Sequence, residues 1–303
     1  MSHSLGQVIM SGADQCLVRD AAGELHLCRL RGRRAARPVC GDRVRWTPGN
    51  PDGLVDGIEP RRNLIERGDF RGRPRGLAAN IDRMVIVVAP EPAPDNLLVD
   101  RYLVLGEALD IAMLLWCNKR DLATWSSAQA LFALQERCRR LGVPVLEGST
   151  ATGDGLAPLR EQTRQQTIIL VGQSGVGKSS ITQALIPSLS LRIGEISATS
   201  GQGRHTTSET TLFHREDGGA LIDSPGVRTL RLDHLGSDAV DQAYPEIAEA
   251  AGNCRFRDCQ HDQEPECGVK RGLASGMIEA ERFDNWRRLR HETGSTDPAE
   301  RGR

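Results

Sequence analysis

Up to about Pro74, the chain consists of short β-like runs that are separated by turn-forming residues. The runs cover residues 7–10, 15–18, 25–30, 42–46 and 53–58, and Gly, Pro, Asn and Asp concentrate between them. Several short strands at this spacing are typical of a small β-barrel. The sequence therefore predicts an amino-terminal β-barrel.

From residue 80 onward, continuous apolar runs alternate with segments of helical periodicity. Buried strands are predicted at 81–89, 111–117, 143–146, 167–171 and 220–222, and helices at 96–109, 126–141, 156–166 and 179–186. Strands that alternate with helices favour a mainly parallel sheet with helices on both faces. Two further helices, at 237–251 and 277–292, flank a cysteine-rich loop. We therefore expect a multi-domain α/β protein with domains at 1–76, 77–235 and 236–303.

Composition is that of a globular protein, with 39% hydrophobic residues, 26% charged residues and a net charge of −1. The amino terminus lacks a basic region followed by an apolar run, and every apolar run is too short to span a bilayer. These features argue against export and against a membrane partner, so the cysteines should be reduced. Most of the scattered cysteines are expected to be small buried hydrophobes. They are Cys16, Cys28, Cys40, Cys117 and Cys138.

Arginines cluster in two stretches of the predicted barrel, and a third group lies on the last predicted helix. Two basic runs that flank one small barrel favour a contact surface for RNA phosphates over a merely solvated loop. For the last helix both interpretations stay open. The barrel residues are Arg29, Arg31, Arg33, Arg34, Arg37, Arg61, Arg62, Arg67, Arg71, Arg73 and Arg75, and the helix residues are Arg282, Arg287, Arg288 and Arg290.

A phosphate-loop motif, GQSGVGKS, begins at Gly172, between a predicted strand and a predicted helix. Glycines let the backbone N–H groups converge on phosphate oxygens, and the helix points its positive end at the same charge. Lys178 would bridge the β- and γ-phosphates, and Ser179 would bind Mg²⁺. The residues expected to contact the nucleotide here are Gly172, Gln173, Ser174, Gly175, Val176, Gly177, Lys178, Ser179 and Ser180.

The tetrad Asn118-Lys119-Arg120-Asp121 directly follows the strand predicted at 111–117. A carboxylate at Asp121 would accept hydrogen bonds from guanine N1–H and N2–H, and adenine lacks this paired donor edge, so the tetrad selects GTP. Asn118 would brace neighbouring loops, and the stem of Lys119 would cover the base. Ser149 and Thr150, after the next strand, would add contacts to the guanine ring.

Two later segments complete a nucleotide site. Asp223 ends an apolar strand, where it would hold the Mg²⁺ hydration shell, and the N–H of Gly226 would sense the γ-phosphate. Thr206 and Thr207 lie between the phosphate loop and Asp223, where a switch segment would bring a hydroxyl onto Mg²⁺. Position 227 is Val, where a catalytic Gln would orient the attacking water, so slow intrinsic hydrolysis is expected. His205 is the candidate to orient the water instead.

The order of these motifs is permuted, because the guanine tetrad precedes the phosphate loop. Domain termini often lie close together, so re-cutting the chain can leave a site intact. The switch at residues 223–226 then leads directly into the carboxy-terminal module, so loss of the γ-phosphate could move that module. Within the module, three thiolates and one imidazole at tetrahedral-site spacing predict one closed, structural Zn²⁺. The ligands are Cys254, Cys259, His261 and Cys267.

The chain resembles a bacterial family of ribosome-associated GTPases, RsgA or YjeQ. The resemblance rests on Asn80-Ile81-Asp82, Arg101-Tyr102-Leu103, the guanine tetrad, the phosphate loop, the segments 203–207 and 223–226, and the zinc set. It implies an amino-terminal OB-fold, a circularly permuted GTPase domain and a helical zinc module. It also implies cytoplasmic action in late maturation of the small ribosomal subunit through its rRNA, with hydrolysis stimulated by that subunit and with His205 as the catalytic switch residue.

The sequence thus favours a GTP hydrolase that acts as a monomer and converts GTP to GDP with Mg²⁺ and one structural zinc. Two alternatives remain open at this point. The first is an RNA-binding scaffold in which the nucleotide is only a slow structural switch, and it rests on the missing Gln after Gly226. The second is an ATP-dependent metabolic kinase, which the tetrad at Asn118–Asp121 disfavours.

Overall fold

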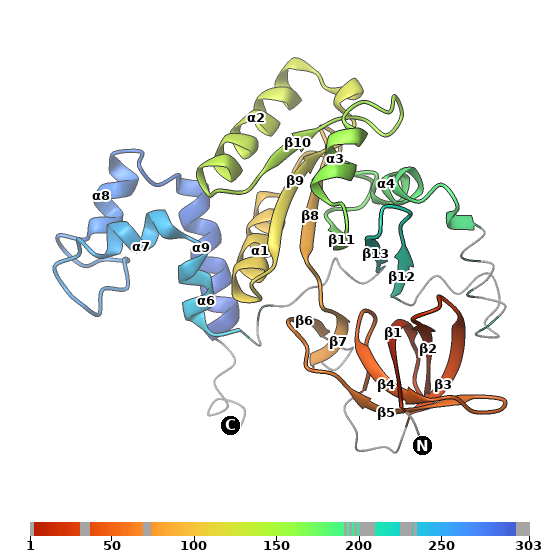
Figure 1. Ribbon diagram of the computed structural model, residues 1–303. Helices are drawn as coiled ribbons and strands as arrows, with labels where there is room; N and C mark the ends of the chain where they lie inside the picture. Colours follow the sequence, from red (N-terminus) through yellow and green to blue (C-terminus); the bar gives the residue numbers. More distant parts are fainter. Residues whose placement is uncertain are drawn as a thin grey trace. The chain divides into compact units, whose positions relative to one another are not determined.

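The computed structural model describes residues 3–30, 37–68, 74–190, 193, 196, 199, 210–224, 232 and 235–294. The chain divides into two compact units, the first comprising 1–95 and 111–230, and the second comprising 96–110 and 231–303. Figure 1 shows the barrel strands, the parallel sheet and the carboxy-terminal helices in chain order. None of the helices in the described part of the chain is long and apolar enough to cross a membrane.

The amino-terminal barrel is a closed sheet of five short strands, in which β3 pairs in parallel with β5 and the other pairs are antiparallel. Its order is β1-β2-β3-β5-β4, and β4 also pairs with β1, which closes the circle. Alternate side chains point inward and form a core around Trp46, Val18 and Val44. The predicted barrel is therefore present. Its strands are β1 (Ser4–Ser11), β2 (Gln15–Asp20), β3 (Leu25–Leu30), β4 (Arg43–Thr47) and β5 (Gly53–Ile58).

A hairpin that the sequence analysis did not predict follows the barrel. Its strands, β6 (Leu64–Gly68) and β7 (Pro74–Ala79), pair antiparallel in a separate sheet. Residues 61–75 were predicted only as a basic stretch. The sequence gives little strand pattern here because charged residues and glycines interrupt the short apolar runs of both strands.

The larger sheet is parallel in the order β10-β9-β8-β11-β13, and β12 joins its edge antiparallel to β13. Its strands read as continuous apolar runs because both faces are buried. The mainly parallel sheet predicted from the sequence is present. The strands are β8 (Arg83–Val88), β9 (Ala112–Cys117), β10 (Val145–Glu147), β11 (Thr167–Val171), β12 (Thr211–His214) and β13 (Ala220–Asp223).

Helices cover the two faces of this sheet. On one face, Leu159 of α3 and Ile181 of α4 join a core with Trp116 of β9. The next residue, Cys117, faces the other way and accepts a hydrogen bond from Gln135 Nε2 of α2 at 3.3 Å. The helices and the short turn between β9 and α2 are η1 (Arg120–Leu122), α2 (Trp125–Arg140), α3 (Leu156–Gln162) and α4 (Lys178–Leu185).

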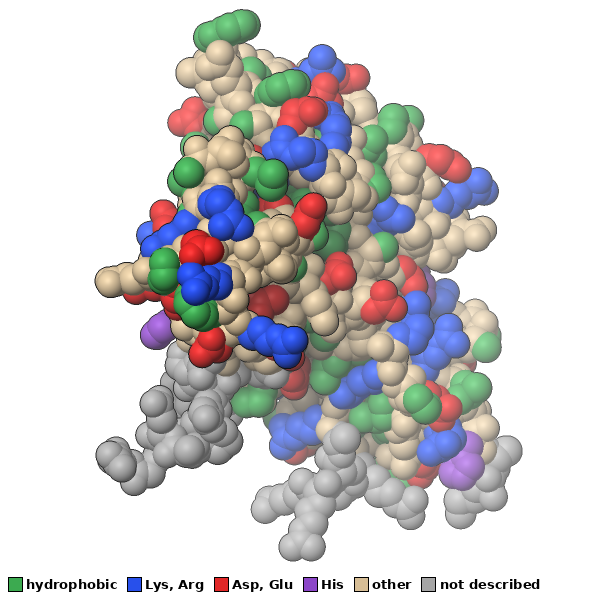
Figure 2. Space-filling model, turned by 90° about the vertical axis from the view of Figure 1, so that its left-hand side faces the viewer, with side chains coloured by type: hydrophobic (Ala, Val, Ile, Leu, Met, Phe, Trp, Pro, Cys, Tyr) green, Lys and Arg blue, Asp and Glu red, His purple; other side chains and the backbone are tan. Residues whose placement is uncertain are grey.

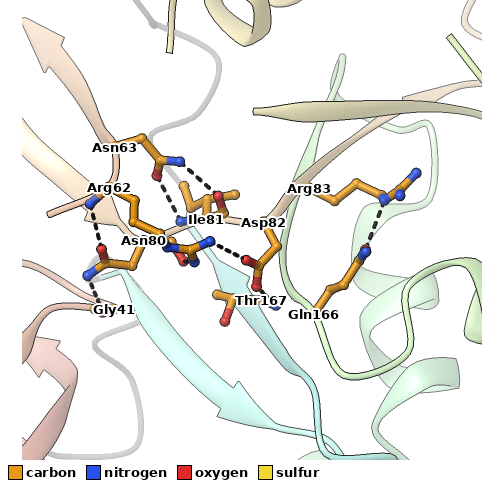
Figure 3. Close-up of polar contacts among 9 residues, drawn as sticks. All are labelled: Gly41, Arg62, Asn63, Asn80, Ile81, Asp82, Arg83, Gln166 and Thr167. Atoms are coloured by element: carbon orange, nitrogen blue, oxygen red, sulfur yellow. Dashed lines mark hydrogen bonds and ion pairs between the residues drawn. The ribbon is translucent and has the colours of Figure 1, made fainter. Parts of the chain in front are cut away.

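Asn80, Ile81 and Asp82 connect the barrel to the sheet, and Figure 3 shows their polar contacts. Asp82 accepts two hydrogen bonds of 2.7 Å, one from Arg62 Nη1 on the barrel side and one from the backbone N of Thr167, the first residue of β11. Asn63 and Ile81 exchange a pair of hydrogen bonds of 2.9 and 2.8 Å. The connection is therefore a bonded junction rather than a loose linker.

Asn80 contributes to the same junction with a left-handed backbone, at φ 58°. Its side-chain amide donates to the carbonyl oxygen of Gly41 at 3.1 Å and accepts from the backbone N of Arg62 at 3.0 Å. Asn tolerates this conformation better than most residues because its short amide bonds to nearby backbone. The barrel also reaches the sheet at a second place, where Met10 of β1 is paired with Thr211 of β12.

The second unit consists of α1 (Asn96–Ala108), α6 (Ser237–Gln242), α7 (Pro245–Ala251), α8 (Gly268–Ala274) and α9 (Ala280–Gly294). The single helix predicted at 237–251 is wrong, because Pro245 starts a new helix and the preceding Tyr244 is not helical. The sequence analysis also treated α8 as part of the cysteine-rich loop.

The predicted basic stripe on the last helix is wrong for Arg282. Its side chain is 2% exposed, forms an ion pair of 2.8 Å with the fully buried Asp100 of α1, and lies over the ring of Tyr244 at 3.8 Å. Arg287 and Arg290 lie against the rings of Phe283 and Trp286. Among the described side chains, basic and acidic groups are interspersed on the face shown in Figure 2.

Candidate nucleotide site and metal centre

The phosphate-loop motif forms the turn between β11 and α4. Gly172, Gly175 and Gly177 adopt φ values of 140°, 81° and 97°. A Cβ on Gly172 would lie 2.2 Å from the carbonyl oxygen of Val87, and one on Gly177 would lie 2.3 Å from the side-chain nitrogen of Asn118. Both the backbone conformation and the available space therefore require glycine at 172 and 177.

The amino terminus of α4 is open to solvent beside this loop. Ser174, Ser179 and Ser180 are at least partly exposed, while Val176 is buried in the sheet core. Lys178 is the first residue of α4, and its ammonium donates to the carbonyl oxygen of Gly172 at 2.7 Å and to that of Gln173. A curled loop with a helix terminus and an ammonium at its mouth is an arrangement that can hold a phosphate chain.

Asn118 joins the predicted guanine and phosphate segments. Its side chain is 1% exposed, and its amide nitrogen donates to the carbonyl oxygen of Val176 at 2.9 Å. Its side-chain oxygen accepts from the backbone N of Thr150 at 3.3 Å. One buried amide therefore bonds the phosphate loop and the loop after β10, which places these segments at one edge of the sheet. This is the carboxyl edge, where open α/β sheets bind ligands.

The other tetrad residues lie on the surface turn after β9. Lys119 has a left-handed backbone at φ 59°, and Asp121 is exposed in η1. Arg120 forms an ion pair with Glu147 at 3.4 Å, across the strand end. Ser149 is buried, and its hydroxyl oxygen accepts from the backbone N of Ala151 at 3.1 Å. Asp121 is therefore exposed to solvent on a turn whose neighbouring residues are held by hydrogen bonds and an ion pair.

A further segment beside the loop was not singled out from the sequence. Residues 89–95 follow β8, and the ammonium of Lys119 donates to the carbonyl oxygen of Glu91 at 3.1 Å. The backbone N of Asp95 donates to the side chain of Gln173 at 3.1 Å, and Pro92 borders Gly175. The signal that could have found this segment is its three prolines at the end of a buried strand.

Asp223 ends β13, which is the neighbour of β11 in the sheet. Desolvation by the surrounding protein raises the pKa of this carboxyl group, and the nearby Lys178 ammonium acts in the opposite direction. The Asp223 carboxylate and the phosphate-loop lysine therefore interact electrostatically. The predicted residues His205, Thr206, Thr207 and Gly226 lie outside the described residues.

The predicted metal ligands form a compact cluster in the second unit. The ligand atoms of Cys254, Cys259, His261 and Cys267 all lie within 4.8 Å of one another. The Cys254 and Cys267 sulfurs are 3.8 Å apart, and each is 3.5 Å from Nδ1 of His261. Zinc with Zn–S bonds of about 2.3 Å and a Zn–N bond of about 2.0 Å places tetrahedral ligands about 3.5 to 3.8 Å apart. The cluster therefore fits one structural zinc.

The surroundings of the cluster suit thiolates. The backbone N of Gly268 donates to the Cys254 sulfur at 3.2 Å, and that of Lys270 donates to the Cys267 sulfur at 3.5 Å, at the start of α8. Burial raises the pKa of the Cys254 thiol, but hydrogen bonds of this kind lower it, and the net shift is downward. The imidazole of His261 lies 5.7 Å from the ring of Trp286, which ties the cluster to α9.

Comparison with known proteins identifies the family. The family model described as RsgA GTPase matches residues 58–233, more than half of the chain. The chain belongs to the RsgA GTPase family. Curated relatives agree. A protein of Ectopseudomonas mendocina (strain ymp) is 43% identical over 271 residues, covering 89% of this chain and 79% of its own length. One of Pseudomonas aeruginosa (strain LESB58) is 42% identical over 293 residues, covering 96% and 86%. Both are called small ribosomal subunit biogenesis GTPase RsgA.

Solved structures of the RsgA family share the fold. YjeQ from Thermotoga maritima is 28% identical, with a TM-score of 0.75 over 96% of this chain and 99% of that one. YloQ, described as a circularly permuted GTPase, is also 28% identical, with a TM-score of 0.71 over 98% of this chain and 97% of its own. The predicted fold class, with its permuted GTPase domain, is therefore confirmed. The chain is a GTP hydrolase that uses GTP and Mg²⁺ and yields GDP, which sets aside the kinase alternative.

Proposed function

We propose that this GTPase binds the small ribosomal subunit through its rRNA, acts late in the maturation of that subunit, and hydrolyses GTP faster when bound. The observation that carries the proposal is the name shared by relatives that are 42% to 44% identical over most of the chain. Because small subunits are assembled in the cytoplasm, we place the protein there. We propose that it acts as a monomer.

Within the site, each segment takes one part of the nucleotide. Asp121 accepts hydrogen bonds from guanine, Lys119 and Arg120 flank the base, and Ser149 and Thr150 border its edge. This assignment is supported by the contacts of Asn118, which hold those two loops together at the sheet edge. Selection against adenine follows from the cost of leaving a carboxylate unpaired.

The phosphates lie on the loop from Gly172 to Ser180. Lys178 exchanges its two carbonyl contacts for the β- and γ-phosphates, and Ser179 binds Mg²⁺. Asp223 holds the hydration shell of the ion. We assign Thr206, Thr207 and Gly226 to the γ-phosphate switch and His205 to the positioning of the attacking water.

The parts of the chain divide the work. We propose that residues 1–76 form an RNA-binding barrel, that 77–235 form the GTPase domain, and that 236–303 form the zinc module. Zinc holds the loop of that module around Cys254 and Cys267, so the metal is structural. GTP orders the switch and favours docking, and hydrolysis then releases the protein from the subunit.

The test measures GTP turnover by the purified chain alone, with purified small subunits, and with large subunits as the control. Stimulation by small subunits only is the expected result. Lys178→Ala should abolish turnover, and wild-type rates in that variant would remove the assignment of the phosphate loop. His205→Ala should lose stimulated turnover and keep GDP affinity.

A scaffold role is the second candidate, and Val227 favours it because the usual water-orienting Gln is missing. It predicts GTP-dependent binding to small subunits with unchanged turnover. The same experiment separates the two functions, because they agree on binding and differ only in stimulation.

A further inference from the structure

A cavity of about 580 Å³ opens beside the barrel in the first unit. Its walls come from the turn after β1, the segment before β4, the β6–β7 hairpin and Thr210, the residue before β12. This volume is typical of cavities that enclose a drug-sized ligand. The cavity can therefore hold one or two nucleotides of a single strand, whereas a duplex is too wide to enter it.

The charge of this cavity is strongly positive. Arg37, Arg61, Arg67 and Arg75 line it, and Glu66 is the one carboxylate in its described wall. We call it the arginine pocket. Apart from Thr210, its residues belong to the barrel side of the chain, and none of them is part of the nucleotide site described above.

The arginines of the pocket differ in how they are held. Arg61 is bound through Nε and Nη2 to the fully buried carboxylate of Asp42, at 2.8 and 2.7 Å. Its charge is therefore balanced within the protein. By contrast, Arg37, Arg67 and Arg75 form no ion pair with any carboxylate of the described residues. These three guanidinium groups supply the positive charge of the pocket that no carboxylate of the described residues pairs with.

Arg67 and Arg75 face each other across the hairpin. They are directly paired in the antiparallel register of β6 and β7. Like charges at such a position destabilise a two-stranded ribbon, and an anion between them removes the repulsion. Guanidinium forks match phosphate oxygens with two parallel hydrogen bonds, so phosphate is the anion that this pair suits best.

The remaining wall indicates which part of a nucleic acid is recognised. It consists of small, aliphatic and proline residues, and no aromatic ring lines the described wall. Bases are bound without sequence preference mainly by stacking on aromatic rings, whereas phosphates are bound by arginine and lysine. The described part of the wall therefore suits the backbone of a strand better than its bases.

We propose that the arginine pocket binds phosphodiester groups of a single-stranded segment of the partner RNA. The proposal rests on the proposed function, because that function supplies the RNA. It goes further by assigning a defined binding site for that RNA, in which Arg67 and Arg75 contact the phosphates.

The position of the pocket gives this contact a route to the GTPase site. Thr210 lines the pocket, and its hydroxyl lies 2.9 Å from that of Ser224, which follows Asp223. The next residue, Thr211, is paired with Asp223 itself. An RNA strand in the pocket would therefore contact Thr210. Thr210 is hydrogen-bonded to Ser224, the neighbour of Asp223, which is proposed to hold the Mg²⁺ hydration shell.

The experiment compares the full-length wild-type chain with Arg67→Ala/Arg75→Ala. Binding to purified small subunits and to rRNA deproteinised from them is measured as a function of salt. We expect affinity for both to fall by about a hundredfold or more, since each of the two truncated arginines removes a charge-assisted hydrogen bond worth about tenfold or more in affinity. The slope of log affinity against log salt should shrink by about 1.4, or about 0.7 for each single-strand phosphate that is no longer neutralised. GDP affinity and basal turnover should not change.

The matched control is Arg43→Ala/Arg45→Ala, which removes the same charge from exposed positions of β4 outside the pocket. An equal loss of affinity in the control would overturn the pocket in favour of a diffuse basic surface. Weaker binding to intact subunits but not to bare rRNA would overturn it in favour of an acidic ribosomal protein. Unchanged binding of the pocket variant would also overturn it.

Failure of the proposed function is distinguishable from failure of the pocket. If the wild type binds neither small subunits nor their rRNA, the partner assignment itself is wrong. If Arg67→Ala/Arg75→Ala fails to fold, Arg75→Gln provides the test at an exposed position, and it should weaken rRNA binding and reduce the salt slope by about 0.7.

Discussion

Replacing Gly177 by Ala should show that the phosphate loop and the guanine tetrad share one buried amide. The substitution has two costs. An L-residue at φ 97° loses about 1 to 2 kcal/mol through its backbone conformation. The new methyl group would also lie 2.3 Å from the side-chain nitrogen of Asn118, so that amide must move.

The second cost can be estimated from the contacts of Asn118. Its amide donates to Val176 and accepts from Thr150, and the side chain is 1% exposed. Leaving one such buried group unsatisfied costs about 1 to 3 kcal/mol. We therefore expect Gly177→Ala to reduce the free energy of unfolding by about 2 to 5 kcal/mol, the sum of the two costs, and to weaken GDP binding.

Gly142→Ala is the matched control, because Gly142 has φ 74° and no atom lies within 4 Å of its added Cβ. It should show only the backbone cost, about 1 to 2 kcal/mol, with normal GDP affinity. Urea unfolding and titration with fluorescent GDP measure both effects. In an Asn118→Ala background the extra cost of Gly177→Ala should disappear, since the opposing amide is gone. Equal destabilisation by Gly177→Ala and Gly142→Ala would refute the reasoning.

Three further predictions concern the rest of the chain. The purified protein should contain one zinc per chain, and Cys267→Ser should release it and expose the second unit to proteolysis; metal content unchanged by the substitution would contradict the cluster. Arg282→Met should reduce the free energy of unfolding in urea by about 3 to 5 kcal/mol, because it removes the cation that balances the buried Asp100 carboxylate, whereas the exposed Arg287→Met should change stability by less than about 0.5 kcal/mol. Burial raises the pKa of Cys28 to about 12. The folded chain then keeps a proton that the unfolded chain loses, so stability should fall as pH rises from about 9 toward 12, less steeply in Cys28→Ala.

The sequence predicted best those features that depend on local pattern or on fixed motif spacing. Gly172 and Gly177 could be placed because a phosphate loop needs glycine at both points whatever surrounds it. The zinc set could be placed because four ligands within fourteen residues close on one ion. The scattered cysteines were also predicted correctly, because all five are buried, and Cys16 and Cys28 lie in the barrel core.

Features that depend on distant partners could not be predicted in this way. Arg282 was expected on a basic surface, but its partner Asp100 lies 182 residues away in the chain, and no local pattern announces that pair. The β6–β7 hairpin was missed because charged residues and glycines interrupt the short apolar runs of its two strands. The break at Pro245 is different, because it could have been predicted from the sequence. A proline disfavours helical backbone at the residue before it, here Tyr244.

The barrel is fastened to the GTPase sheet at two separated places, and this limits how it can respond to RNA. Asp82 bonds the start of β11 at one end of the sheet, and Met10 pairs with Thr211 beside Asp223 at the other. A body pinned at a single point can swivel freely, but one pinned at two can turn only about the axis through both pins. A force that RNA exerts on the barrel is therefore shared between both attachments, and one of them lies beside Asp223.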